Sequence, residues 1–148
     1  FLMLNQKKIL IVDDEKDIRS LVSGVLRDQG IQTREAWDST TTYAELHKRV
    51  PSLILLDIWL EGSPDDGLEI LAKLRKQHED LAVIMISGHG NIETAVKATR
   101  LGAYDFIEKP FSMDHLTQSI QSVFKFKKNS IFYFFCGNTS SRYICWYF

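Results

Sequence analysis

Ile9-Leu-Ile-Val-Asp-Asp14 opens the organised part of the chain, with four apolar residues followed directly by two aspartates. Two later runs have the same form: Leu53-Ile-Leu-Leu56 ends at Asp57, and Leu81-Ala-Val-Ile-Met-Ile86 ends at Ser87. Continuous rather than alternating apolarity is typical of strands that are covered on both faces, as in a parallel sheet flanked by helices. The three runs therefore predict the centre of an α/β fold.

Two weaker strands are expected at 32–36 and 104–107, and the segments between strands show the spacing of amphipathic helices. Five β-α repeats in about 120 residues predict a doubly wound, five-stranded parallel sheet in the flavodoxin-like order 2-1-3-4-5, with five helices. The apolar faces of the helices are expected to comprise Ile18, Leu21, Val22, Val25 and Leu26; Tyr43, Leu46 and Val50; Leu68, Leu71 and Leu74; Ile92, Ala95, Val96 and Thr99; and Leu116, Ile120, Val123 and Phe124.

Composition excludes several classes of protein. The 148 residues are 45% hydrophobic and 25% charged with a formal net charge of -1, so no broad basic surface for nucleic acid is expected. No apolar run approaches the roughly 20 residues of a membrane helix, and no signal-peptide pattern is present. Cys136 and Cys145 are spaced like neither a zinc site nor a redox pair. We expect a cytoplasmic protein with no membrane partner.

The organisation predicts an N-terminal extension at 1–6, one domain at 7–126 and an atypical tail at 127–148. The tail contains 8 of the 17 aromatic residues and shows neither strand nor helix spacing. We favour a tail outside the fold, of out-of-frame or vector-derived sequence. An added edge strand or dimer contact is the second interpretation, and a membrane-surface anchor is the third.

Polar residues stand where four of the predicted strands end. Asp13 and Asp14 end the first strand, Asp57 the third and Ser87 the fourth, and Lys109 follows the fifth. Ligands of open α/β sheets bind outside the carboxyl ends of the strands, so we expect these side chains to share one crevice.

Three neighbouring carboxylates repel one another unless a cation joins them, and an all-oxygen cluster suits Mg²⁺. One carboxylate can then act as a nucleophile toward phosphorus, with Lys109 and Ser87 as donors to phosphoryl oxygens. Each residue also has a plainer interpretation, since an aspartate after a strand is usually a turn former or a helix cap. Asp14 in particular could only cap the first helix. Capping does not account for reactive residues at four strand ends.

Four motifs carry a family resemblance: Ile11-Val-Asp-Asp-Glu15, Leu56-Asp57, Ile86-Ser-Gly88 and Phe106-Ile-Glu-Lys-Pro-Phe111. Together they resemble the receiver domains of bacterial two-component response regulators, which have a CheY-like fold, over about 120 residues. The resemblance implies a phosphoacceptor rather than an enzyme, which takes its phosphoryl group from a sensor histidine kinase.

The resemblance also assigns roles to residues. It implies that Asp57 is the phosphoacceptor and that Mg²⁺ is bound by Asp13, Asp14, Asp57 and the backbone carbonyl of Trp59. Ser87 and Lys109 would contact the phosphoryl group, and the peptide bond between Lys109 and Pro110 would be cis.

The length of the loop after Asp57 indicates which type of response regulator the chain resembles. Asp57-Ile-Trp-Leu-Glu-Gly-Ser-Pro-Asp-Asp-Gly67 places a glycine ten residues after the phosphoacceptor, where most receivers have one at eight. This longer loop is similar to that of the NtrX type of nitrogen-regulation regulators, which implies an NtrY-like kinase as partner. Regulators of that type continue into an ATPase and a DNA-binding domain. The chain contains neither motif, so we expect a truncated regulator without direct nucleic-acid binding.

Switching and phosphate lifetime give further expectations. By resemblance, Ser87 and Phe106 form the switch, and phosphorylation favours a homodimer through the fourth helix, fifth strand and fifth helix. A plain core role for Phe106 stays open. Trp59 and His89 each lie two residues past a site residue, so they are expected to flank the phosphoryl group and tune its lifetime. A solvated loop role for His89 also stays open.

Three other functions compete with a phosphorylated receiver. A haloacid-dehalogenase-type phosphatase also uses a strand-end aspartate, but it needs a second acid where Trp59 stands. A nucleotide-binding module needs a glycine-rich loop where Asp13-Asp14-Glu15 stands. A degenerate receiver that acts only as an interaction module is disfavoured because every site position carries a competent residue.

Overall fold

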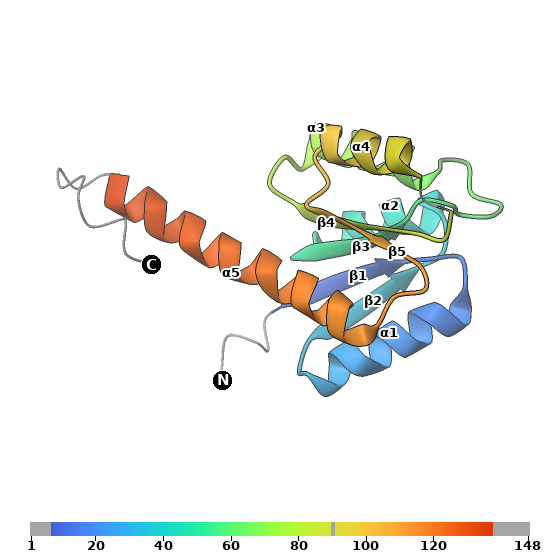
Figure 1. Ribbon diagram of the computed structural model, residues 1–148, viewed down its shortest axis with the longest axis horizontal. Coiled ribbons are helices and arrows are strands. Elements are labelled where there is room, and N and C mark those ends of the chain that lie inside the picture. The colour runs from blue at the N-terminus through green and yellow to red at the C-terminus, as the bar shows by residue number, and fades with distance from the viewer. Residues whose placement is uncertain (1–6, 90, 138–148) are drawn as a thin grey trace. The chain divides into compact units, whose positions relative to one another are not determined.

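The apolar runs form a five-stranded parallel sheet in the order β2-β1-β3-β4-β5, as predicted (Figure 1). The computed structural model describes residues 7–89 and 91–137, with side chains up to residue 125. It divides into two units, Phe1–Met113 and Asp114–Phe148. The strands all belong to the first unit: β1 Lys8–Val12, β2 Gln32–Ala36, β3 Leu53–Asp57, β4 Ala82–Ser87 and β5 Asp105–Glu108.

Helices cover both faces of this sheet. One face carries α1, and the other carries α2, α3 and α4 (Figure 1). Their bounds are Lys16–Asp28 for α1, Ser39–Lys48 for α2, Gly67–Gln77 for α3 and Ile92–Arg100 for α4. Asp38 and Asp66 begin α2 and α3 with capping boxes. The residue that caps α1 is Glu15, and it makes no side-chain capping bond. Asp14 is therefore not the helix cap of the plainer interpretation.

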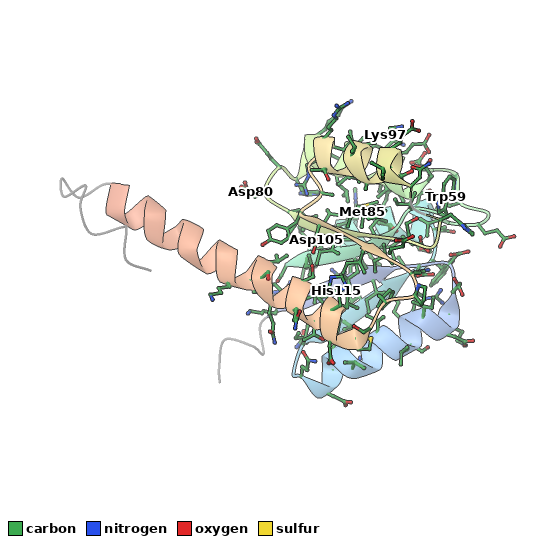
Figure 2. All side chains as sticks on the ribbon, in the orientation of Figure 1. Trp59, Asp80, Met85, Lys97, Asp105 and His115 are labelled. Atoms are coloured by element: carbon green, nitrogen blue, oxygen red, sulfur yellow. The ribbon has the colours of Figure 1, made fainter. Side chains whose placement is uncertain are left out.

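The central strands are buried along their whole length, which explains their continuous apolarity. The interior between the sheet and helices α2 to α4 holds residues such as Leu56 and Met85, both fully buried. Figure 2 shows Met85 on this side of the sheet. Val12 pairs with Leu56, and Asp57 pairs with Ile86. This register brings the ends of β1, β3 and β4 to one edge of the sheet.

Several predicted core positions are wrong. Leu21 is exposed, and Val50 lies beyond the end of α2 and is exposed as well. In α4, Ile92 is 84% exposed and Val96 42% exposed, and only Ala98 is buried. Because α4 packs through this small side chain, its strongest apolar positions face away from the core. Helical spacing located these helices but did not fix which face is buried.

The second unit contains α5, which spans Met113–Gly137. The sequence predicted no regular structure after residue 126, but the helix continues as far as Gly137. No glycine or proline occurs from Met113 to Cys136, so nothing in the backbone ends the helix earlier. Residues 127–137 are thus helical rather than an edge strand. The division at residue 126 stays a prediction, and the predictions for 1–6 and 138–148 concern segments outside the described residues.

Candidate functional site

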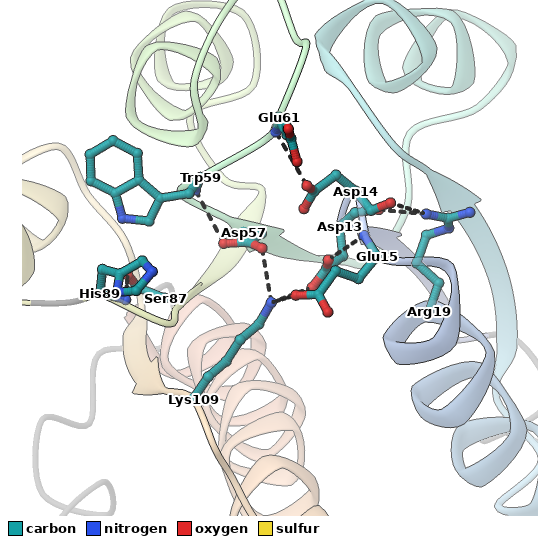
Figure 3. A network of polar contacts seen from close by, with 10 residues as sticks. All are labelled: Asp13, Asp14, Glu15, Arg19, Asp57, Trp59, Glu61, Ser87, His89 and Lys109. Atoms are coloured by element: carbon teal, nitrogen blue, oxygen red, sulfur yellow. Dashed lines mark hydrogen bonds and ion pairs between the residues drawn. The ribbon is translucent and has the colours of Figure 1, made fainter.

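Four strand ends deliver the predicted side chains to one place. Asp13 follows β1, Asp57 ends β3, Ser87 ends β4 and Lys109 follows β5. Figure 3 shows these side chains converging at the carboxyl edge of the sheet. The expected proximity of Asp13, Asp14, Asp57 and Lys109 is therefore confirmed, and the predicted roles of these residues stay predictions.

The Lys109 ammonium lies at the centre of this arrangement. Its Nζ donates to Asp13 Oδ2 at 2.8 Å and to Asp57 Oδ2 at 2.9 Å (Figure 3). A longer contact of 3.5 Å reaches Glu15 Oε1. Asp13 and Asp57 are 2% and 3% exposed, so one cation is shared by two buried carboxylates. Lys109 is thus placed to contact any group bonded to Asp57.

Backbone N–H groups hold the other carboxylate oxygens. Asp57 Oδ1 accepts from the N–H of Trp59 at 3.1 Å, and Asp13 Oδ1 accepts from the N–H of Glu15 at 2.8 Å. Each donor lies two residues after its acceptor, as in an Asx turn. Asp14 Oδ2 accepts from the more distant N–H of Glu61 at 3.3 Å. These bonds fix the directions of the three carboxylates.

The three aspartates form a metal-ligand cluster. One carboxylate oxygen from each of Asp13, Asp14 and Asp57 lies within 4.8 Å of the others. Hard oxygen donors at the ends of strands suit Mg²⁺, which needs few protein ligands and keeps several waters. The donor set therefore fits the predicted cofactor. The carbonyl of Trp59 as a further ligand stays a prediction.

Electrostatics show why this site needs a cation. Burial, with the negative charge of Asp13, raises the pKa of Asp57 to about 6, although the hydrogen bond from Lys109 opposes this shift. Burial likewise raises the pKa of Asp13. Burial lowers the pKa of Lys109, but hydrogen bonds to Asp13 and Asp57 outweigh this effect, so its pKa lies above the usual value. One ammonium therefore does not fully compensate the two buried carboxylates.

The remaining predicted residues surround Asp57. Ser87 is completely buried, and its Oγ accepts from the N–H of His89 at 3.3 Å. The side chains of Trp59 and His89 lie on the same side of the Asp57 carboxylate (Figure 3). Trp59 is 53% exposed, so its indole borders the site without being part of the core. Phe106 is partly buried against the core, and its movement as a switch stays a prediction.

The turn after β5 has the predicted geometry. The peptide bond between Lys109 and Pro110 is cis. The N–H of Lys109 donates to the carbonyl of Ser87 at 2.8 Å, which ties this turn to the end of β4. Lys109 thereby reaches the carboxylates from a fixed backbone position.

A model of the response regulator receiver domain matches residues 9–121. The chain belongs to this family. NtrX of Azorhizobium caulinodans is 58% identical over 108 residues, covering 73% of this chain and 24% of that protein. An NtrX-like regulator of Rickettsia bellii is 46% identical over 126 residues, covering 83% of this chain and 26% of the relative. The chain thus spans about a quarter of the length of these relatives.

Solved receiver structures agree with the fold. The receiver domain of NtrX from Brucella abortus is 56% identical, with a TM-score of 0.76 over 79% of this chain and 98% of that one. The beryllofluoride-activated NtrC4 receiver domain dimer is 34% identical, with a TM-score of 0.76 over 81% and 98%. The chain is therefore a receiver of the phosphoacceptor family, similar to NtrX. None of its described helices is long and apolar enough to cross a membrane.

Gly67 has a steric role in this receiver that sequence reasoning missed. A Cβ atom at this position would lie 2.2 Å from the carbonyl oxygen of Asp57 and 2.6 Å from Cα of Ile58. The N–H of Gly67 also donates to the carbonyl of Ile58 at 2.8 Å. The start of α3 therefore packs directly on the backbone of Asp57 and Ile58. The glycine at the end of the longer loop was visible in the sequence. Its close approach to the backbone of Asp57 was not.

The long loop between β3 and α3 is held at its far end by polar contacts. Asp65 Oδ2 accepts from the hydroxyl of Tyr43 at 2.7 Å and from Nζ of Lys73 at 2.6 Å. Ser63 Oγ accepts from the N–H of Ser39 at 2.8 Å and donates to the carbonyl of Asp65 at 2.6 Å. The loop that carries Trp59 and Glu61 is thus fastened to α2 and α3. Loop composition alone did not reveal these partners.

Proposed function

We propose that Asp57 accepts a phosphoryl group from a sensor histidine kinase, with Mg²⁺ held by Asp13, Asp14 and Asp57. The observation that carries this proposal is the cluster of three carboxylates with the Lys109 ammonium within 2.9 Å of two of them. Membership of the receiver family and the similarity to NtrX support the proposal, with an NtrY-like kinase as the partner.

The chain's own residues would divide the work of phosphoryl transfer. A carboxylate oxygen of Asp57 attacks phosphorus as the bond between phosphorus and the kinase's histidine nitrogen breaks. The freed imidazole takes a proton from solvent. Lys109 is placed to hold a phosphoryl oxygen, and the Ser87 hydroxyl is a second donor. Mg²⁺, when bound, would neutralise charge on the carboxylates and the phosphoryl oxygens.

We propose that Ser87 turns toward the phosphoryl group and that Phe106 moves with it. We also propose that phosphorylation favours a homodimer through α4, β5 and α5. Ile92 and Val96 of α4 are 84% and 42% exposed, so both apolar side chains are accessible to a partner that binds this helix. Transcriptional output would require further domains of the kind that the longer NtrX relatives have room for. We propose that the protein acts in the cytoplasm.

Trp59 and His89 are proposed to set the lifetime of the phosphoryl group. Hydrolysis needs a water molecule in line with the bond between Asp57 and phosphorus, and the indole of Trp59 borders that side of the carboxylate (Figure 3). We expect Trp59→Ala to lose phosphate faster than wild type. A rate equal to that of wild type would show that the indole does not hinder water. His89→Ala, measured alongside, separates the contribution of the imidazole.

The proposal is tested by intact mass after incubation with Mg²⁺ and acetyl phosphate. Wild type should gain one phosphoryl group, whereas Asp57→Asn and wild type with excess EDTA should gain none. Circular dichroism of each protein shows whether it is folded. A folded wild type that gains no mass would contradict the proposal and favour a receiver that acts only as an interaction module.

A further inference from the structure

Arg19 lies in the first turns of α1, and its guanidinium lies behind the acidic pair. The residue is 9% exposed, although arginine is rarely buried unless it is paired. Its Nη1 donates to the main-chain carbonyl of Asp13 at 2.8 Å and to that of Asp14 at 3.2 Å (Figure 3). A single nitrogen thus binds the backbone of both residues whose carboxylates form most of the metal-ligand cluster.

The other side of the guanidinium is fixed to β2 and the residue that follows it. Nε of Arg19 lies 3.3 Å from Oε1 of Glu35, as an ion pair without the angle of a hydrogen bond. The guanidinium carbon lies 5.7 Å from the centre of the Trp37 ring, within the range of a cation–π contact. Because these contacts approach from a neighbouring strand, the guanidinium cannot follow a movement of the acidic turn freely.

The contacts determine what Arg19 can do for the metal-ligand cluster. A peptide carbonyl and the side chain of the same residue turn together when the backbone rotates. Holding the carbonyls of Asp13 and Asp14 restricts the backbone of the turn from which both carboxylates project, while bonds from the N–H groups of Glu15 and Glu61 orient the carboxylates themselves. The positive charge of Arg19 by itself repels Mg²⁺, so weaker Mg²⁺ binding after its removal reports the loss of positioning and not the loss of charge.

We propose that Arg19 is a positioning residue that sets the Mg²⁺ affinity of this receiver by holding the backbone of Asp13 and Asp14. The inference rests on the proposed function, because it takes these aspartates as ligands of Mg²⁺. Partners one step removed from a metal typically change its affinity by about 10–100-fold when they are lost. Arg19→Met should therefore bind Mg²⁺ at least about tenfold more weakly, while its long apolar side chain retains the packing of the arginine stem.

Arg27 provides a matched control on the same helix. Its Nε donates to the hydroxyl of Thr33 at 2.9 Å. Thr33 pairs with Ile9, four residues before Asp13. Arg27→Met removes the same charge from α1 without touching the backbone of the acidic pair. Its Mg²⁺ affinity should equal that of wild type.

The experiment is calorimetric titration of Mg²⁺ into the full chain, unphosphorylated, with a thermal melt of each protein. The inference requires weaker binding by Arg19→Met and unchanged binding by Arg27→Met. It also requires that saturating Mg²⁺ restores the phosphorylation rate of Arg19→Met with acetyl phosphate, because only the affinity has changed. A purely structural role would lower the melting temperature while leaving the Mg²⁺ affinity of the folded protein unchanged, and that result would overturn the inference.

Two further outcomes are distinguishable. If Arg19→Met does not fold, Arg19→Lys decides, because a lysine ammonium lacks the planar fork that reaches the two carbonyls and Glu35 together. Weaker Mg²⁺ binding by the lysine variant supports the inference, and unchanged binding overturns it.

If wild type itself binds no Mg²⁺, the proposed function fails and this inference fails with it. If wild type binds and both Arg19 variants bind equally well, only this inference fails.

Discussion

Replacing Asp57 with asparagine should stabilise the protein in the absence of Mg²⁺. The carboxyl is 3% exposed, and burial, with the neighbouring Asp13, raises its pKa from 3.8 to about 6. That difference corresponds to a penalty of about 3 kcal/mol for the ionised form in the folded state, near neutral pH. Asparagine has nearly the same shape but no charge, so Asp57→Asn should raise the free energy of unfolding by up to about 3 kcal/mol.

The advantage of the variant should depend on pH with a definite sign. The penalty in wild type is complete above the folded pKa of about 6 and absent below the unfolded value of 3.8. The difference between the proteins should therefore shrink to about half near pH 5 and vanish in stronger acid. Urea unfolding of both proteins in EDTA, at neutral pH and at pH 5, measures this difference in stability. Adding Mg²⁺ should stabilise wild type more than the variant, because a metal that binds only the folded form stabilises it and Asp57 is one of the proposed ligands.

Asp65→Asn is a control of the opposite sign. Hydrogen bonds from Lys73 and Tyr43 lower the pKa of Asp65, so its ionised form stabilises the fold. This stability is present above the ordinary pKa and is lost as pH falls through the lower folded value. The variant should be slightly less stable than wild type near neutral pH, by no more than about 1 kcal/mol, because the pair is partly exposed. An Asp57→Asn protein that is less stable than wild type in EDTA would refute the reasoning about the acidic site.

Two further predictions concern packing and assembly. Gly67→Ala should destabilise the protein by about 1–3 kcal/mol and slow phosphorylation of Asp57, since its Cβ would overlap the carbonyl of Asp57; Gly24→Ala, with open space around it, should be neutral or stabilising. Urea unfolding and the phosphorylation rate with acetyl phosphate check both variants, and equal stability of the two would contradict the steric argument. Phosphorylated wild type should dimerise in sedimentation, whereas Val96→Asp should stay monomeric; a dimer of that variant would place the interface elsewhere.

The sheet and the site were predictable because both depend on local patterns. Apolar runs that end at Asp13, Asp57 and Ser87 mark buried parallel strands, and the geometry of such sheets brings those ends together. The order of the strands, the cis bond before Pro110 and the contact of Lys109 with the carboxylates all agree with these expectations. The apolar runs are local, the cis bond was implied by the family resemblance, and the contact of Lys109 with Asp57, 52 residues away, follows from the parallel topology.

Other features depend on contacts that a sequence pattern does not contain. The buried residue of α4 is Ala98, whereas the larger Ile92 and Val96 are exposed, so the size of the apolar side chains did not indicate the buried face. Arginine is usually a surface residue, so nothing in the sequence placed Arg19 in the interior. Its proposed role depends on hydrogen bonds to two backbone carbonyls, which a sequence pattern does not reveal. Likewise, the length of α5 follows from the absence of a helix-breaking residue before Gly137, although the aromatic composition suggested otherwise.

The most direct test of the central claim is to locate the phosphoryl group on the chain. After phosphorylation with acetyl phosphate and Mg²⁺, borohydride reduction converts an aspartyl phosphate to homoserine, which peptide mass spectrometry can place. The account predicts homoserine at position 57 and at no other aspartate, and only when Mg²⁺ is present during phosphorylation. Homoserine at Asp13 or Asp14, or at none of the aspartates in the folded protein, would contradict it.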